Sequence, residues 1–206
     1  MSHYLDKIKR FPIWEKAFTY LIQNNTASHP YHNTRHCINV FNTAINIIDT
    51  YEDIDINDVV NLGLACLFHD FNHSGGKLKD RENIEIAIDE FNRFVELNVQ
   101  YFNVYAITDI VGMILCTEFP KTKEPSIFIQ QIIMDADLFQ CYDHDWFIFA
   151  IKGLADERGV PESQALKDQT NFINSVTYYT EFAQKIHEEK KEGYLEQLEY
   201  LKTVFK

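Results

Sequence analysis

Residues 59–70 of the chain have the sequence VVNLGLACLFHD. Among the first ten of these residues only Asn61 is polar, so a helix over this segment would be apolar on nearly all sides. A helix of that kind is buried on most of its surface, so the pattern predicts a central helix of the fold. The segment ends in His69 and Asp70, two polar residues that this helix would carry out of the core.

Helical spacing of apolar residues continues along most of the chain. Examples are Cys37, Phe41, Ala44, Ile45 and Ile48, then Val104, Ile107, Val111, Ile114 and Leu115, then Phe172, Ile173, Val176, Tyr179 and Phe182. No segment of similar length alternates strictly between apolar and polar residues, as a half-buried strand would. We therefore expect an all-α fold, a compact helical bundle. The 7 glycines and 5 prolines are few and mark turns between helices, so one domain over residues 1–206 is predicted.

Composition excludes several classes of function. The chain has 19 lysines and arginines against 31 aspartates and glutamates, a formal net charge of −12, so nucleic acid is not expected as a partner. No run approaches about eighteen apolar residues, and the first ten residues are charged throughout, so we expect neither a membrane segment nor a signal peptide. The predicted location is cytoplasmic. Four separated cysteines predict free thiols, and no pattern indicates an oligomeric state.

Residue types that bind divalent metals occur in four separate segments. These hold His32 and His36, then His69, Asp70 and His73, then Thr117 and Glu118, then Asp135 and Asp137. On a helix, residues four apart share a face, so each pair of histidines could point at one volume. A carboxylate buried at the end of an apolar helix costs roughly several kcal/mol unless a cation or strong donors accompany it. A divalent ion removes that cost; oxygen ligands suit Mg2+, and imidazoles shift the choice towards Mn2+, Fe2+ or Zn2+.

Two of these segments carry recognisable motifs. YHNTRH at 31–36 and HDFNHSG at 69–75 resemble the YHNxxH and HDxxHxG signatures of the HD-domain superfamily of metal-dependent phosphohydrolases. The match is closest to the catalytic domains of class I 3′,5′-cyclic nucleotide phosphodiesterases. Similar segments follow in the same order, namely NIEIA at 83–87, TE at 117–118, ADL at 136–138 and QTNFI at 169–173. The resemblance covers about residues 31–187, and the ordered set is far more specific than the HD pair alone.

The resemblance implies a bundle of the HD-domain type that binds two divalent metal ions. The candidate metals are Zn2+, Mn2+, Fe2+ and Mg2+. His36, His69, Asp70 and Asp137 would hold the first ion, and Asp70 would also reach the second. Asp135, two residues before Asp137, is the alternative last ligand. In the family, a hydroxide that bridges the two ions attacks the phosphorus of a cyclic nucleotide. The expected partner is therefore a small-molecule nucleotide substrate.

The resemblance also implies roles for residues around the metals. His32, held by Glu85, would protonate the leaving 3′ oxygen as a general acid. His73 and Thr117 would orient the carboxylates or the bound waters. The expected substrate-binding residues are Gln169 and Phe172, which would hold the nucleobase, together with Gln140 and Tyr31.

Three functions fit this pattern. The first is hydrolysis of a cyclic nucleotide, either a 3′,5′-cyclic mononucleotide or a cyclic oligonucleotide, because the segments that wall the family's pocket are shorter here. The second is an HD-type nucleotide phosphohydrolase acting on nucleoside mono- or triphosphates, which needs the same metal ligands but neither Gln169 nor His32. The third is a non-catalytic protein that sequesters a nucleotide. Leu78 and Gln140, which replace asparagines of the family, motivate this third function.

Overall fold

The computed structural model describes residues 3–139, 142 and 149–205. In chain order, its helices are α1 (His3–Ile8), α2 (Pro12–Asn24), α3 (Thr34–Ile48), α4 (Ile56–Phe68), α5 (Asp80–Leu97), η1 (Val99–Tyr101), α6 (Val104–Cys116), α7 (Phe128–Phe139), η3 (Phe149–Gly153), α9 (Leu154–Arg158), α10 (Glu162–Ser175) and α11 (Glu181–Val204). The β pairing among the described residues is one isolated bridge between Ser28 and Asn33. The predicted all-α helical fold is confirmed.

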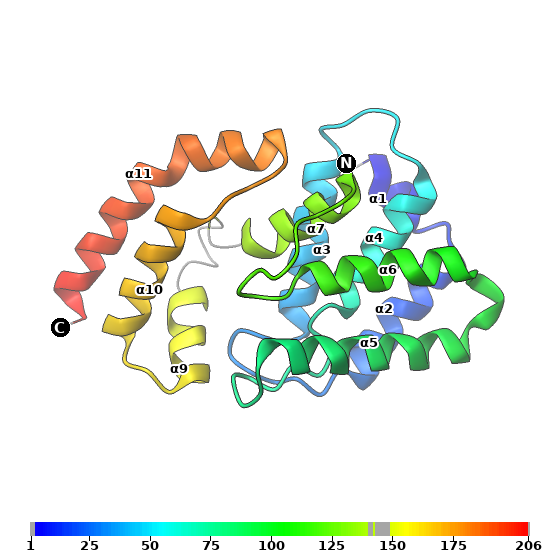
Figure 1. Cartoon of the computed structure of the whole chain (residues 1–206), viewed down its shortest axis with the longest axis horizontal. Coiled ribbons are helices and arrows are strands. Elements are labelled where there is room, and N and C mark those ends of the chain that lie inside the picture. Colours follow the sequence, from blue (N-terminus) through cyan, green and yellow to red (C-terminus); the bar gives the residue numbers. More distant parts are fainter. Residues whose placement is uncertain (1–2, 140–141, 143–148, 206) are drawn as a thin grey trace.

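Helix α4 lies at the centre of the N-terminal part of the fold and contacts α1, α2, α3, α5, α6 and α7 (Figure 1). Every residue from 62 to 68 is buried, which confirms the predicted central helix. Gly63 lets two neighbouring helices approach closely. A Cβ at this position would lie 2.9 Å from Cζ3 of Trp14 on α2 and 3.3 Å from Cε2 of Phe41 on α3. Since that space is already filled, a larger residue would force its neighbours to shift.

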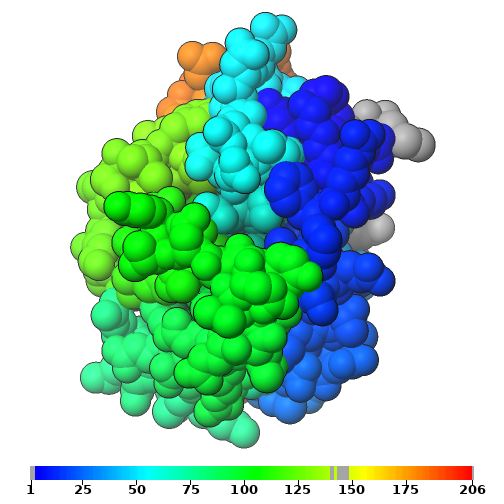
Figure 2. Space-filling view, turned by 90° about the vertical axis from the view of Figure 1, so that its right-hand side faces the viewer, coloured from blue at the N-terminus to red at the C-terminus, as the bar shows by residue number. Residues whose placement is uncertain are grey.

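The buried apolar side chains form two clusters. The larger cluster runs from Tyr4 to Ala136 and fills the interior of the bundle of α1 to α7. The smaller cluster runs from Tyr142 to Leu198 and joins η3, α9, α10 and α11. Figure 1 places α9, α10 and α11 to one side of the bundle, and Figure 2 shows the opposite end, where α1 and α2 lie beside the connection of α5 to α6.

Asp135 of α7 links the bundle to the start of α11. Asp135 is almost completely buried, with 1% of its surface exposed. The carboxylate accepts hydrogen bonds from the backbone N–H groups of Tyr179 at 3.0 Å and Thr180 at 2.7 Å. Thr180 is the N-cap of α11, and its hydroxyl accepts a bond from the N–H of Ala183. Asp135 therefore fixes the position at which α11 begins.

No helix among the described residues is long and apolar enough to cross a membrane. Cys37, Cys66 and Cys116 are buried free thiols, as predicted, whereas Cys141 lies outside the described residues. Burial raises the pKa of Cys37 and of Cys66 to about 12, so these thiols carry little of the nucleophilic thiolate at neutral pH.

We expect the substitution Asp135→Ala to lower the free energy of unfolding by about 1–3 kcal/mol, because it leaves the N–H groups of residues 179 and 180 without their acceptor. Asp135→Asn keeps an acceptor oxygen and should cost less. Urea denaturation followed by circular dichroism measures both effects. Asp89→Ala, at an exposed position of α5, is the control and should change stability by less than about 0.5 kcal/mol. A loss in Asp135→Ala no larger than in the control would contradict this role.

Candidate functional site

Ligand atoms from four predicted residues meet at one place, which we call the His/Asp cluster. Nε2 of His36, in the first turn of α3, lies 3.0 Å from Oδ2 of Asp70 and 3.2 Å from Oδ1 of Asp137. Nε2 of His69, directly after α4, lies 3.4 Å from each of the same two oxygens. The two Nε2 atoms are 3.2 Å apart. Since Asp137 comes from α7, three helices position the cluster.

Asn33 holds His36 in place by capping α3. Its Oδ1 accepts hydrogen bonds from the N–H groups of Arg35 and His36, and its Nδ2 donates to the carbonyl of His29 at 2.7 Å. Because the helix begins only after Asn33, His32 lies in the bend that precedes it. The prediction that His32 and His36 share a helix face is therefore wrong, although both side chains lie at the site.

The turn after α4 determines how His69 and Asp70 are presented. Helix α4 ends at Phe68, and Nδ1–H of His69 donates to the carbonyl of Cys66 at 2.9 Å. When the ring is neutral, this bond places the lone pair on Nε2, which is the tautomer that a metal ligand needs. The helix does not reach His73, so the predicted pairing of His69 and His73 on one helix face is also wrong.

His73 packs beside the cluster instead of joining it. Its ring stacks on the ring of His32 with 3.8 Å between the centroids, and its Nδ1 accepts a hydrogen bond from the N–H of Gly75 at 3.1 Å. Burial lowers the pKa of His73 to about 4, so the ring is neutral at pH 7. Gly75 has a φ of +65°, and a Cβ there would overlap the ring of His29, so glycine is required at this turn.

Charge is balanced within the His/Asp cluster. Burial alone would raise the pKa of Asp70, but the neighbouring His69 and a hydrogen bond from His36 hold it well below its usual value. Burial also opposes ionisation of Asp137, yet hydrogen bonds from the same two histidines lower its pKa to about 2. Conversely, burial would lower the pKa of His69, while the two carboxylates raise it well above its usual value. A divalent ion that binds here therefore has to displace protons from the histidines.

The donor atoms of the cluster fit a divalent ion. Two imidazole nitrogens and two carboxylate oxygens are ligands that Zn2+, Mn2+ and Fe2+ accept. Ligand atoms bonded at about 2.0–2.2 Å lie roughly 3.0–3.5 Å apart in octahedral or tetrahedral arrangements. The four histidine–carboxylate atom pairs are 3.0–3.4 Å apart, which is the spacing of neighbouring ligands in a coordination shell. Ligand atoms from His36, His69 and Asp137, one from each, lie within 4.8 Å of one another, and Asp70 adjoins this group through its contacts with both histidines.

The two candidate last ligands are clearly separated in the structure. Asp135 uses its oxygens on the backbone of residues 179 and 180, and burial raises its pKa to about 7. Asp137 lies two residues further along α7, at the His/Asp cluster. Of these two aspartates, Asp137 is therefore the one placed to bind a metal.

Glu157 of α9, and not Glu85, holds His32. Nδ1 of His32 lies 2.6 Å from Oε2 of Glu157, whose Oε1 accepts from the backbone N–H groups of Tyr31 and His32 at 2.6 and 2.7 Å. Although burial opposes ionisation, these hydrogen bonds lower the pKa of Glu157. Glu85 is exposed and forms an ion pair with Arg81 at 3.2 Å, so its predicted role is wrong. No local pattern pointed to Glu157, which lies 125 residues beyond His32.

The predicted roles of Thr117 and Gln140 are not supported by the described residues. Thr117 is the C-cap of α6, and its hydroxyl donates to the carbonyl of Ile114 at 2.8 Å. It lines a small cavity of about 180 Å3 together with Asp137, but its hydroxyl bonds to its own helix and not to a carboxylate ligand. The predicted orienting contact is thus not found among the described residues. Gln140 lies outside them.

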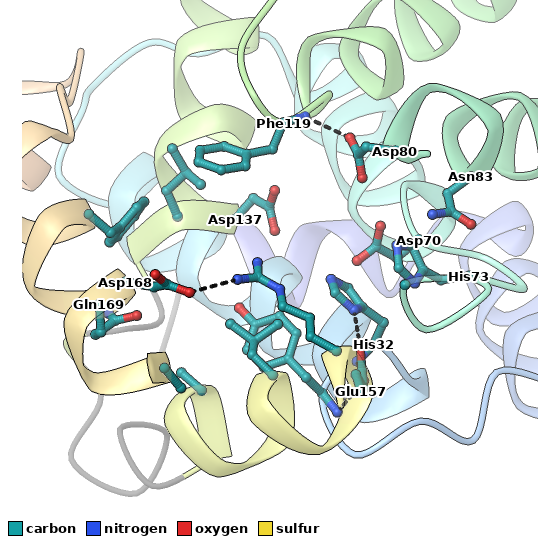
Figure 3. A pocket seen from close by; sticks show the side chains of 18 of the residues that line it. His32, Asp70, His73, Asp80, Asn83, Phe119, Asp137, Glu157, Asp168 and Gln169 are labelled. Atoms are coloured by element: carbon teal, nitrogen blue, oxygen red, sulfur yellow. Dashed lines mark hydrogen bonds and ion pairs between the residues drawn. The ribbon is translucent and has the colours of Figure 1, made fainter. Parts of the chain in front are cut away.

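A larger cavity of about 510 Å3 opens onto the His/Asp cluster, and its volume falls in the range of roughly 300–1,000 Å3 that is usual for small-molecule sites. Figure 3 shows Asp70 and His73 on one side of this cavity and Asp168 and Gln169 on the other. The predicted residues Tyr31, Gln169 and Phe172 all line it. The cavity therefore extends from the candidate metal ligands to α10.

The α10 side of the cavity has an aromatic surface and a polar group. The ring of Phe172 packs against the ring of Phe119 at 6.3 Å between centroids in an edge-to-face arrangement. Gln169 is only 9% exposed, and it lines this side of the cavity. A side-chain amide that lines a cavity can both donate and accept a hydrogen bond, so Gln169 is suited to bind a ligand.

Comparisons with known proteins bear on the fold. The crystal structure of the Lin1889 protein from Listeria innocua is similar to this chain, with a TM-score of 0.60 and 16% sequence identity. The similarity covers 92% of this chain and 93% of that one. No protein-family model matches the sequence, and no curated protein matches it significantly. At this identity the likeness establishes a shared fold.

We expect the protein to bind Mn2+ with release of protons, and Asp137→Asn to weaken the affinity by at least about 100-fold, because a direct ligand is lost. Affinity should fall as the pH falls, since protons compete with the ion for His36 and His69. Isothermal titration calorimetry in two buffers of different ionisation enthalpy measures affinity and proton release. Glu85→Gln removes an exposed carboxylate of α5 and should change affinity less than about threefold. Wild-type affinity in Asp137→Asn would rule out this metal site.

Proposed function

We propose that this protein is a metal-dependent phosphodiesterase that hydrolyses a cyclic nucleotide. One observation carries the proposal: a His/Asp cluster suited to divalent ions and a histidine anchored by a buried glutamate line the same cavity. Cleavage of a phosphate ester needs stabilisation of negative charge and a proton for the leaving oxygen, and these two groups would supply them. The ordered motifs of the sequence point to the same reaction.

His36, His69, Asp70 and Asp137 would hold the first metal ion, and Asp70 would be shared with a second. Bound divalent ions would lower the pKa of a coordinated water and offset the charge of the phosphoryl oxygens. The two histidine side chains are 1% exposed, whereas those of Asp70 and Asp137 are 12% and 17% exposed. The imidazoles are thus fixed from within, and the carboxylates face the cavity that a substrate would enter.

His32 would act as the proton donor. Glu157 occupies its Nδ1, so Nε2 is the ring nitrogen available to a substrate. As the oxygen of a water molecule bonds to phosphorus and releases one proton to the solvent, the bond from phosphorus to the 3′ oxygen breaks. The protonated ring then gives its Nε2 proton to that oxygen, which is a poor leaving group as an alkoxide. Glu157 contributes by fixing the orientation of the ring and the nitrogen that faces the substrate.

The far wall of the cavity would bind the base of the nucleotide. The rings of Phe119 and Phe172 offer an apolar surface for a base, and Gln169 offers both a donor and an acceptor to its edge. A nucleotide monophosphate hydrolase does not need this wall, because recognition of the phosphate would suffice. The presence of Gln169 and Phe172 in the cavity wall therefore favours the cyclic nucleotide reaction over that alternative.

The direct test is incubation of the metal-loaded protein with a panel of 3′,5′-cyclic mononucleotides and cyclic oligonucleotides, with products separated by chromatography. We expect hydrolysis of one P–O bond in at least one cyclic nucleotide of the panel. His32→Ala should lower kcat by about 10²- to 10⁴-fold while Mn2+ affinity is kept, because general acid catalysis is lost. Glu157→Gln should lower kcat less, and Glu85→Gln should keep full activity.

Three results would overturn the proposal. Absence of turnover of every cyclic nucleotide by metal-loaded protein would exclude it. Turnover of nucleoside mono- or triphosphates alone, together with full activity of Gln169→Ala, would identify a nucleotide phosphohydrolase. Tight nucleotide binding without product, at an affinity that His32→Ala leaves unchanged, would identify a sequestering protein.

A further inference from the structure

The charges that line the large cavity are unequal. Its carboxylates belong to Asp70, Asp80, Asp137, Glu157 and Asp168. Among the described lining residues, Arg158 is the one arginine or lysine. Metal ions at the His/Asp cluster would offset the carboxylates at that end of the cavity. At the α10 end, a positive charge comes from Arg158.

Arg158 stands where α9 ends, next to the glutamate that holds His32. Helix α9 ends there because Gly159 adopts a left-handed conformation with a φ of +63°, and its N–H bonds back to the carbonyl of Asp156. Since Glu157 fixes α9 against His32, the backbone of Arg158 is held in register with the catalytic histidine. The last two residues of α9 thus connect the proton donor with the α10 side of the cavity.

The ion pair that Arg158 makes is loose. Its Nη1 lies 3.7 Å from Oδ2 of Asp168, which is longer than a hydrogen bond, and the two side chains are 48% and 42% exposed (dashed line in Figure 3). An exposed pair of this kind contributes little to stability. Asp168 also accepts a hydrogen bond from Nε2 of Gln164 at 2.8 Å, so it keeps a partner if the guanidinium turns away.

Polar residues of α10 continue from this pair along the cavity. Asp168, Asn171 and Ser175 line it at positions three and four apart, which is one face of a helix. Gln169 and Phe172 lie on the same face, at the place assigned above to the base. The cavity therefore has polar groups beside the proposed base-binding residues, and a cyclic mononucleotide bound at the His/Asp cluster carries no second phosphate that Arg158 could bind.

We propose that Arg158 binds a second phosphate of the substrate, so that the substrate is a nucleotide with one phosphate at the His/Asp cluster and another at the end of α9. This inference rests on the proposed function and narrows its substrate to nucleotides with two phosphates, of which a cyclic dinucleotide is the simplest. Arginine suits the role because its planar guanidinium can donate two parallel hydrogen bonds to phosphate oxygens. A phosphate would replace the loose contact with Asp168 by this stronger one.

The test measures binding in the His32→Ala background, loaded with Mn2+, so that the nucleotides are not consumed. Calorimetry compares a cyclic dinucleotide of adenylate, a linear adenylate dinucleotide with a 5′ phosphate, and 3′,5′-cyclic adenosine monophosphate. Arg158→Gln should weaken binding of the cyclic dinucleotide by about 10- to 100-fold, and that of the cyclic mononucleotide much less. Asp168→Asn should tighten binding of the dinucleotide, because it removes the competing carboxylate. The linear dinucleotide shows whether Arg158 prefers an internal phosphodiester or a terminal phosphate.

Lys167→Gln removes a positive charge from the exposed side of α10 and is the matched control, with an expected change of less than about twofold for each nucleotide. Equal effects of Arg158→Gln on nucleotides with one and two phosphates would overturn the inference, as would no effect at all. Unchanged thermal unfolding of Arg158→Gln would show that the loss is local. If metal-loaded protein binds none of the nucleotides, the proposed function fails and this inference fails with it.

Discussion

The packing of two partly buried carboxylates against two buried imidazoles is the constraint on which the rest of the site depends. Such charges are tolerated inside a protein only when protons, hydrogen bonds or a metal ion compensate them. Here they come from the start of α3, the turn after α4 and the body of α7, so the packing of these three helices fixes the positions of the ligand atoms. The apolar surface of α4 holds that arrangement in place, since every residue of its last two turns is buried.

The C-terminal helices complete this centre from the other side. Glu157 on α9 binds both the side chain and the backbone of His32, and α10 provides the far wall of the cavity. Asp135 holds the start of α11 to α7, two residues before the candidate metal ligand Asp137. The smaller apolar cluster therefore does more than add stability, because its helices carry Glu157, which orients His32, and residues that line the cavity.

The fold and most candidate ligands could be predicted from the sequence, because their signals are local. The continuous apolar run of α4 and the ordered motifs lie within short windows of residues. Helical spacing was misleading at His32 and His73, since α3 begins only after its N-cap Asn33 and α4 ends at Phe68, so neither histidine lies in a helix. Glu157 was missed because it meets His32 only through tertiary packing across 125 residues, which no local pattern records. Glu85 matched a motif, yet it faces solvent.

A crystal structure of the protein grown with Mn2+, with anomalous diffraction recorded near the manganese absorption edge, tests the central claim most directly. We predict an anomalous peak about 2.0–2.3 Å from Nε2 of His36 and His69 and from carboxylate oxygens of Asp70 and Asp137. A structure in which manganese binds only elsewhere, while these four side chains surround ordered water alone, would contradict the claim.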